Sequence, residues 1–229
     1  YYAALVPCII SALIASGVAG LFNITPTMFI ISEICELSIS TGIRFMIMSV
    51  IFALASIVFC YMLHSSAKIY SEYLSNPYIR IIIAGVLVII LRYITGTTDY
   101  LGAGAPMIAA SFITSCSWYV FILKMLFTAI TLGGGFKGGE IVPTLFVGAT
   151  LGSFLAPVFG LPIGLFCGVT NCPLTSFILS IEMFGAGSMK FVIICVAISY
   201  MLSGYYSLYN SQKIVYSKYK TEYINRHSH

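Results

Sequence analysis

The chain has 229 residues, of which 59% are hydrophobic and 8% are charged, and its formal net charge is +4. A soluble domain usually carries about 25% charged residues, so this composition excludes water as the main solvent of the chain. A net charge this small also gives no reason to expect nucleic acid as a partner.

Four apolar segments approach the roughly 20 residues that a membrane-spanning helix needs. They cover residues 3–22, 42–63, 78–94 and 118–132. Several such segments in one chain predict a polytopic membrane protein rather than a singly anchored one. The sequence opens on two tyrosines, without an initiator methionine or a signal sequence, so we interpret the chain as a fragment whose beginning is missing.

Two interruptions between the apolar segments do not have the composition of soluble linkers. Residues 64–76 form an amphipathic stretch that Pro77 closes. Residues 95–106 hold Asp99, the only aspartate of the chain, among glycines and other small residues. This second stretch is either a re-entrant loop or an ordinary external turn.

Lys124 lies inside the apolar segment 118–132, where a lone lysine is energetically costly. Its ammonium group must therefore pair with another group or reach water. Two readings stay open: a structural contact to backbone carbonyls or to an acid within the bundle, or a functional role.

The apolar pieces that follow Gly133 are shorter and are separated by glycine or proline. They cover residues 144–158, 161–169, 174–184 and 191–202. Lengths nearer half a bilayer predict broken helices, which secondary transporters use to bring helix ends to an ion at mid-membrane.

Residues 133–143 read GGGFKGGEIVP, with five glycines and a proline between two apolar segments. Glycines let the backbone turn so that successive N–H groups point the same way, and Pro143 suits the start of a helix. The pattern predicts an anion cradle at the positive end of that helix. It is not a phosphate-binding P-loop, because Gly138 follows Lys137 where that motif needs serine or threonine.

Glu140 is the anomaly of this segment, since a carboxylate in an anion cradle would repel the ligand. It either caps the helix that begins near Pro143 or takes part in function as a protonatable group.

The remaining chemistry-bearing residues point to neither metal nor enzyme. Cys167 and Cys172 are the only closely spaced cysteines, and no second cysteine or histidine pair accompanies them, so we expect no metal site and no cofactor. An intramembrane enzyme would need a nucleophile with its base or a set of metal ligands, and no HExxH, Gly-x-Ser-x-Gly or paired aspartate occurs.

Several motifs in order resemble the CLC superfamily of anion channels and anion/proton antiporters. They are LKMLFTAITLGGG, the GGEIVP turn, TLFVGATLGS, NCPLTSFILSIEM and SLYNSQK, and they span residues 118–213. The resemblance implies an all-α polytopic fold with short broken and re-entrant helices, of which this chain is one half of an inverted repeat. It also implies a homodimer, with contacts from residues 174–184, 191–202 and the first apolar block.

The resemblance further implies roles for individual residues. Backbone N–H groups around Glu140 and Ile141 would bind the anion, and Tyr209 of SLYNSQK would contact it through its hydroxyl. The alternative for Tyr209 is a place in an aromatic belt at the membrane interface. The expected anion-binding residues are Gly138, Gly139, Glu140, Ile141, Val142 and Tyr209, with Glu140 as the candidate for proton coupling.

The pattern GFKGGE with a later TNCP looks like the bacterial fluoride-exporting branch, because chloride-type relatives usually carry an apolar residue in place of Glu140. The predicted function is fluoride export coupled to protons, with a chloride channel or chloride/proton exchanger as the alternative. A non-transporting structural membrane subunit is the competing class. The gating glutamate of the family belongs to the first half, which this chain lacks, so the chain alone should not transport.

The expected location is the cell membrane, with several spans. Basic residues gather after the last apolar segment, which by the positive-inside rule places the C-terminus in the cytoplasm. We assign residues 1–222 to the transmembrane domain and residues 223–229 to a cytoplasmic tail.

Overall fold

The structure is a computed structural model that describes residues 2–24, 28–29, 38–160, 173–185, 187, 189–204, 207, 213–220 and 222–227. Its elements are α1 (Tyr2–Leu21), α2 (Ile39–Tyr73), α3 (Pro77–Thr95), α4 (Ala105–Ala110), α5 (Tyr119–Gly133), α6 (Ile141–Phe159), α7 (Pro173–Phe184), α8 (Met189–Leu202), β1 (Lys213–Tyr216) and β2 (Tyr223–His227). The predicted polytopic helical fold is confirmed, because α1, α2, α3 and α6 are long and apolar enough to cross a membrane. The expected helical piece at residues 161–169 lies outside the described residues.

Helix α2 is a single helix of 35 residues that joins the predicted span 42–63 to the amphipathic stretch 64–76. The side chain of Ser38 caps its start by accepting a hydrogen bond from the Thr41 N–H. Asn76 then caps α3 in the same way, and Pro77 occupies the first turn of α3, where its missing N–H costs nothing. Pro77 therefore begins the next helix, as well as closing the stretch before it.

Helix α6 corrects one prediction. We expected a half-length piece at residues 144–158, whereas α6 has 19 residues and qualifies as a full span. The positions of two prolines explain the difference in length. Pro143 lies in the first turn, where no helical hydrogen bond is lost, and Pro157 lies in the last turn, just before Gly160 ends the helix in the left-handed conformation.

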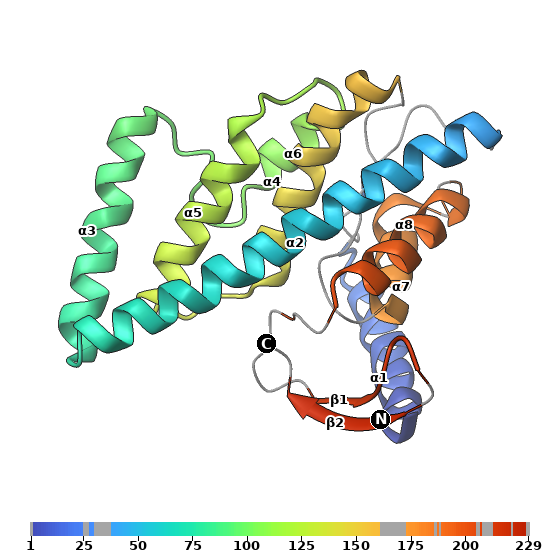
Figure 1. The fold of residues 1–229 in the computed structure, drawn as a ribbon, viewed down its shortest axis with the longest axis horizontal. Helices are drawn as coiled ribbons and strands as arrows, with labels where there is room; N and C mark the ends of the chain where they lie inside the picture. The colour runs from blue at the N-terminus through green and yellow to red at the C-terminus, as the bar shows by residue number, and fades with distance from the viewer. Residues whose placement is uncertain are drawn as a thin grey trace.

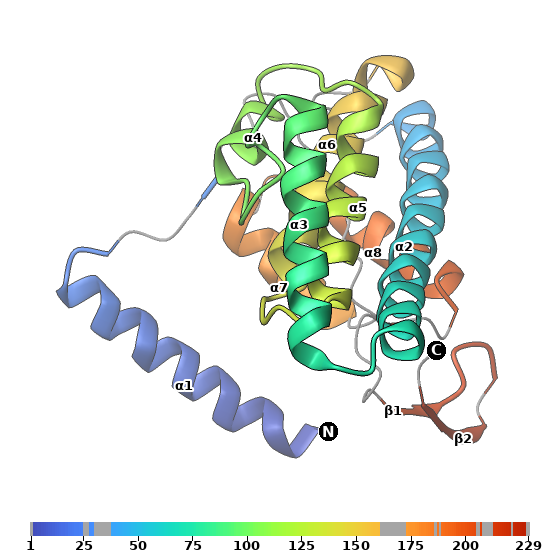
Figure 2. The same ribbon diagram turned by 90° about the vertical axis from the view of Figure 1, so that its left-hand side faces the viewer.

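The core of the bundle forms around α2, α5, α6 and α8, and Figure 1 shows α2 running obliquely past the other three. One cluster joins Phe45 of α2 to Phe191 of α8, and another joins Phe59 to Met125 of α5. Figure 2 shows α1 apart from this bundle, and its described side chains are almost all exposed. An apolar helix that the chain itself does not cover needs lipid or protein around it.

A small antiparallel hairpin of β1 and β2 follows the helices, and no sequence pattern predicted it. It joins residues on both sides of the expected domain boundary at residue 222. Lys218 tethers it to the end of α8, because its Nζ donates a hydrogen bond to the Tyr200 carbonyl at 2.7 Å and lies 4.0 Å from the centre of the Tyr200 ring. Burial lowers the pKa of Lys218 to about 8, so this tether begins to lose its charge in mildly alkaline solution.

Candidate functional site

The glycines between α5 and α6 have different structural tasks. A Cβ at Gly133 would lie 2.1 Å from the Ser66 Oγ of α2, and one at Gly134 would lie 2.2 Å from the Ala84 Cβ of α3. These two glycines therefore let α2 and α3 pack tightly on the end of α5. Gly135 has a φ of 97°, which a residue with a side chain rarely adopts, and it turns the chain toward α6.

Helix α6 begins with free backbone donors. Glu140 stands at the N-cap, and its side chain makes no capping hydrogen bond. The first helical bond runs from the Thr144 N–H to the Glu140 carbonyl at 3.2 Å. As at any helix start, the N–H groups of Ile141 and Val142 then have no acceptor within the helix, and the helix dipole makes this end positive.

A cavity of about 430 Å³ lies beside this helix start. It is lined by Val88, Tyr100, Leu101, Gly102, Ala103, Lys124, Phe127, Thr128, Thr131, Leu132, Lys137, Gly138, Gly139, Val142 and Pro143. Among the predicted anion-binding residues, Gly138, Gly139 and Val142 line it, whereas Glu140 and Ile141 do not. The structure thus brings three of the expected residues to one hollow, together with two lysines.

Lys124 carries a positive charge into this cavity although its side chain is only 2% exposed. Its Nζ donates hydrogen bonds to the carbonyls of Tyr100 at 3.0 Å and Gly102 at 2.7 Å, and lies 4.8 Å from the centre of the Phe146 ring. The contact to backbone carbonyls is the structural reading left open by the sequence. An ammonium group has three protons, so these two acceptors leave one donor available.

The loop between α3 and α4 packs against α5 and α6. Its Tyr100 is 4% exposed, and Leu101, Gly102 and Ala103 beside it line the cavity. Gly104 makes the close approach possible, because a Cβ there would lie 2.6 Å from the Phe146 ring and its φ is 69°. The sequence did not predict that this loop lines the cavity. A signal was present, because Lys124, Thr128 and Thr131 recur at helical spacing and so share one face of α5.

The Glu140 side chain is half-buried and does not line the cavity. It lies within electrostatic range of the Cys60 thiol, and its Oε2 is buried without a hydrogen-bond partner among the described residues. A buried carboxyl oxygen without a donor is energetically costly, and a proton or a donor group relieves that cost. Tyr209, the other polar residue predicted for the site, lies outside the described residues.

A comparison with family models identifies the chain. The model of the voltage gated chloride channel family matches residues 1–204. The chain belongs to the voltage-gated chloride channel (CLC) family. The resemblance stated from the motifs is thereby confirmed.

Individual CLC proteins are similar along most of the chain. A chloride/fluoride channel protein of Pseudomonas syringae pv. tomato is 29% identical over 95% of this chain and 52% of its own length. An uncharacterized protein of Methanocaldococcus jannaschii is 28% identical over 80% of this chain and 49% of its own length. The chain therefore spans about half the length of the curated relatives that it matches.

The fold is also that of a solved CLC structure. The crystal structure of a CLC-type fluoride/proton antiporter superposes with a TM-score of 0.84 at 28% identity, over 91% of this chain and 55% of that one. The predicted fold class, one half of a CLC fold, is confirmed.

Proposed function

We propose that this chain forms the C-terminal half of a membrane transporter that exports fluoride in exchange for protons. The observation that carries the proposal is the cavity at the start of α6, where Lys124, Lys137 and the positive end of a helix surround one hollow. Positive charge and free N–H groups without competing carboxylates at the wall favour a small anion. Two similar proteins support the choice of ion, because one is named a chloride/fluoride channel and the other a fluoride/proton antiporter.

Glu140 is the residue to which we assign proton coupling. Glu140 stands between the cavity-lining residues Gly139 and Val142 in sequence but does not itself line the cavity. Its unpartnered Oε2 would hold the proton. Fluoride is a strong hydrogen-bond acceptor, so a protonated Glu140 that rotates toward the cavity would donate to it, where a charged carboxylate would repel it.

The assembly and orientation follow from the same reasoning. We propose a homodimer in which α7, α8 and the exposed helix α1 form the contact, and a cytoplasmic C-terminus. The transmembrane domain would then cover residues 1–222, with Tyr209 contacting the anion from the end of that domain. A preceding half of the protein would supply the opposite wall of the pore.

Removal of the Glu140 carboxylate tests the proton role. In liposomes carrying the full-length protein, Glu140→Gln should reduce proton-coupled fluoride flux at least about tenfold, since the typical contribution of a positioned proton-transfer group is 10²–10⁴. A fluoride-selective electrode together with a pH electrode measures both ions. Glu72→Gln is the matched control, because Glu72 is exposed on α2 and pairs only with Lys68.

Coupled flux that survives Glu140→Gln unchanged contradicts the proton role. The second candidate function, a chloride channel or chloride/proton exchanger, is favoured by the family that matches the chain. Replacing fluoride by chloride in the same liposomes separates the two, because a fluoride exporter releases fluoride faster than chloride.

A further inference from the structure

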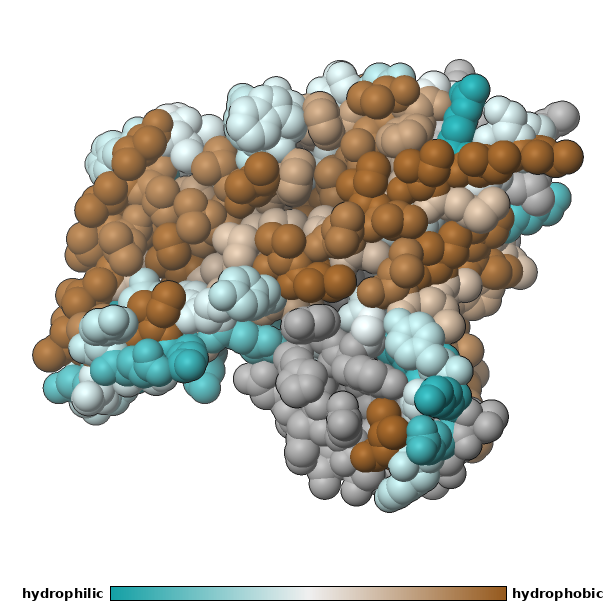
Figure 3. Space-filling view, viewed as in Figure 1, coloured by the Kyte–Doolittle hydropathy of each residue, from teal (hydrophilic) through white to brown (hydrophobic). Residues whose placement is uncertain are grey.

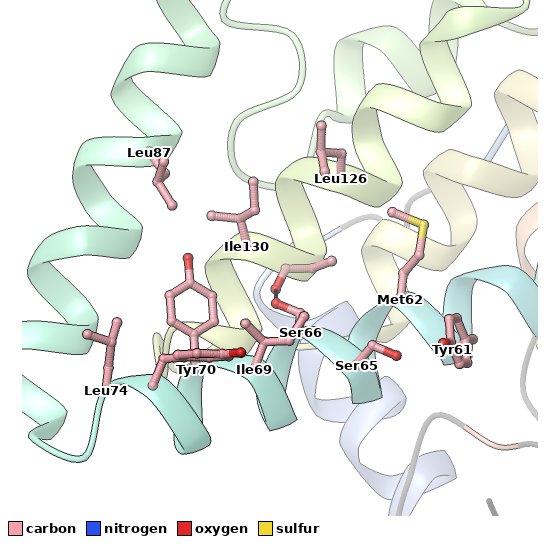
Figure 4. A pocket seen from close by; sticks show the side chains of 12 residues that line it. Tyr61, Met62, Ser65, Ser66, Ile69, Tyr70, Leu74, Leu87, Leu126 and Ile130 are labelled. Atoms are coloured by element: carbon pink, nitrogen blue, oxygen red, sulfur yellow. Dashed lines mark hydrogen bonds between the residues drawn. The ribbon is translucent and has the colours of Figure 1, made fainter.

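A second hollow lies on the other side of α5 from the anion cavity. It is a groove of about 450 Å³ between α2, α3 and α5, drawn in Figure 4. Its lining is almost wholly apolar and consists of Tyr61, Met62, Ser65, Ser66, Ile69, Tyr70, Tyr73, Leu74, Leu87, Leu126, Ala129 and Ile130. Nothing in the anion-transport proposal uses it.

The groove exists because α2, α3 and α5 meet at one end and diverge from there, which leaves space between them. The Ser66 hydroxyl donates to the Ala129 carbonyl at 2.6 Å, which fixes α2 against the end of α5. Gly134 brings Ala84 of α3 against the same end. Above this junction α3 leans away from α2 and α5 (Figure 1), and the space between them stays open.

One polar atom in the groove has no partner. Tyr70 is 8% exposed, and its hydroxyl oxygen is buried without a hydrogen bond among the described residues. Leaving a buried hydroxyl unpaired is energetically costly, so an acceptor on a ligand in the groove would relieve that cost. Tyr70 itself lines the groove, among mostly apolar side chains (Figure 4).

Positive charge marks one end of the groove. The Arg80 guanidinium donates from Nε and Nη2 to the carbonyl of Leu74, a lining residue, at 3.3 and 3.0 Å. Lys68 on α2 is exposed and forms an ion pair with Glu72 at 3.8 Å, so Arg80 is the uncompensated charge near this end among the described residues. Figure 3 shows a hydrophilic patch at this α2–α3 turn below an otherwise apolar face. Basic side chains beside an apolar surface are the pattern that attracts anionic lipid headgroups.

The groove also has the length of one leaflet. Its α2 wall runs from Tyr61 to Tyr73, about 18 Å at 1.5 Å per residue, and half of a typical hydrocarbon core is about 15 Å. We propose that the groove holds one acyl chain of an anionic phospholipid. The phosphate lies at Arg80, and an ester carbonyl accepts the hydrogen bond of Tyr70.

Photoreactive lipid tests the proposal on the full-length protein in nanodiscs. A phosphatidylglycerol with a diazirine in the middle of one acyl chain is illuminated, and labelled peptides are identified by mass spectrometry. Met62 and Leu126 should be labelled several times more strongly than the openly exposed Ile82 and Ile89 of α3, and excess unlabelled phosphatidylglycerol should compete.

Conservative variants separate the lipid site from general contact with the bilayer. Arg80→Gln should reduce the preference for phosphatidylglycerol over phosphatidylcholine about fivefold, the effect of one basic residue at a membrane surface. Tyr70→Phe keeps the ring and should weaken groove labelling, whereas Tyr78→Phe, on an exposed residue outside the groove, should not.

Two outcomes overturn the proposal. Labelling of Met62 and Leu126 that is no stronger than that of Ile82 shows only bulk lipid contact. An absence of label at the groove, while Ile82 is labelled, shows that another part of the protein covers it. Both outcomes leave the anion-transport proposal intact, because the groove and the cavity are on opposite faces of α5.

Discussion

The two faces of α5 border hollows of nearly equal size, about 430 and 450 Å³, with opposite chemistry. One face presents Lys124, Thr128 and Thr131 to the cavity beside α6. The other presents Leu126 and Ile130 to the groove beside α3. The two hollows therefore differ in chemistry and not in volume, and the polar stripe on α5 is what assigns the proposed ion site to one of them.

A substitution at the contact between α2 and α5 should have the largest effect, because α5 borders both hollows. Gly133→Val places atoms where the Ser66 side chain lies, so α2 and α5 must separate. Overpacking of this kind costs about 3 kcal/mol of unfolding free energy or more. Thermal unfolding in detergent should show a clear loss of stability. Gly42→Ala on α2 is the control because no atom lies within 4 Å of the added Cβ, and a stability equal to that of Gly133→Val would contradict the packing argument.

Lys124→Met should damage only the cavity side. It removes the buried charge and leaves the Tyr100 and Gly102 carbonyls without their donor, which costs about 2 kcal/mol. Anion flux into liposomes should fall at least tenfold, because the cavity loses its buried cation. Lys124→Arg keeps the charge and should retain part of the flux.

The same two lysine variants separate charge from structure. If Lys124→Met is destabilised but transports at the normal rate, Lys124 is only a structural tie between α5 and the loop at residues 95–106. Lipid labelling in the groove should be unaffected in either case.

The smallest effects are expected from substitutions at Thr131 and Ile130, which are neighbours in sequence on opposite faces of α5. Thr131→Val removes one hydroxyl that lines the cavity and bonds only to the Phe127 carbonyl of its own helix, so stability should change by less than about 0.5 kcal/mol. Anion flux should fall about threefold. Ile130→Val, on the groove face, should cost about 1 kcal/mol and leave flux unchanged. Flux that responds equally to both substitutions would remove the distinction between the faces.

The sequence predicted the helices well because long apolar segments leave few alternatives in a membrane. It also located the start of α6, since glycines, a lysine and a proline stand together at residues 133–143. It did not show that Gly133 and Gly134 serve packing while Gly138 and Gly139 line the cavity. That division depends on where Ser66 and Ala84 lie, which local pattern does not encode.

Other parts of the site depend on contacts between distant segments. The sequence left two readings open for Lys124 and two for the loop at residues 95–106. The hydrogen bonds from the lysine to the loop carbonyls supply the structural contact, whereas its functional role and the re-entrant course of the loop stay predictions. The groove had no sequence signal at all. Its apolar side chains look like those of any lipid-facing helix, and only the divergence of α3 from α2 leaves the space empty.

The length of α2 has a mechanical consequence. Its 35 residues measure about 52 Å, well beyond a hydrocarbon core of about 30 Å, so it must tilt or project. It contacts α8 near its start through Phe45 and α5 further along through Ser66. A stiff helix fixed towards both ends by different neighbours ties those neighbours together. A shift of α8 relative to α5 would therefore have to bend α2 or break one of the two contacts.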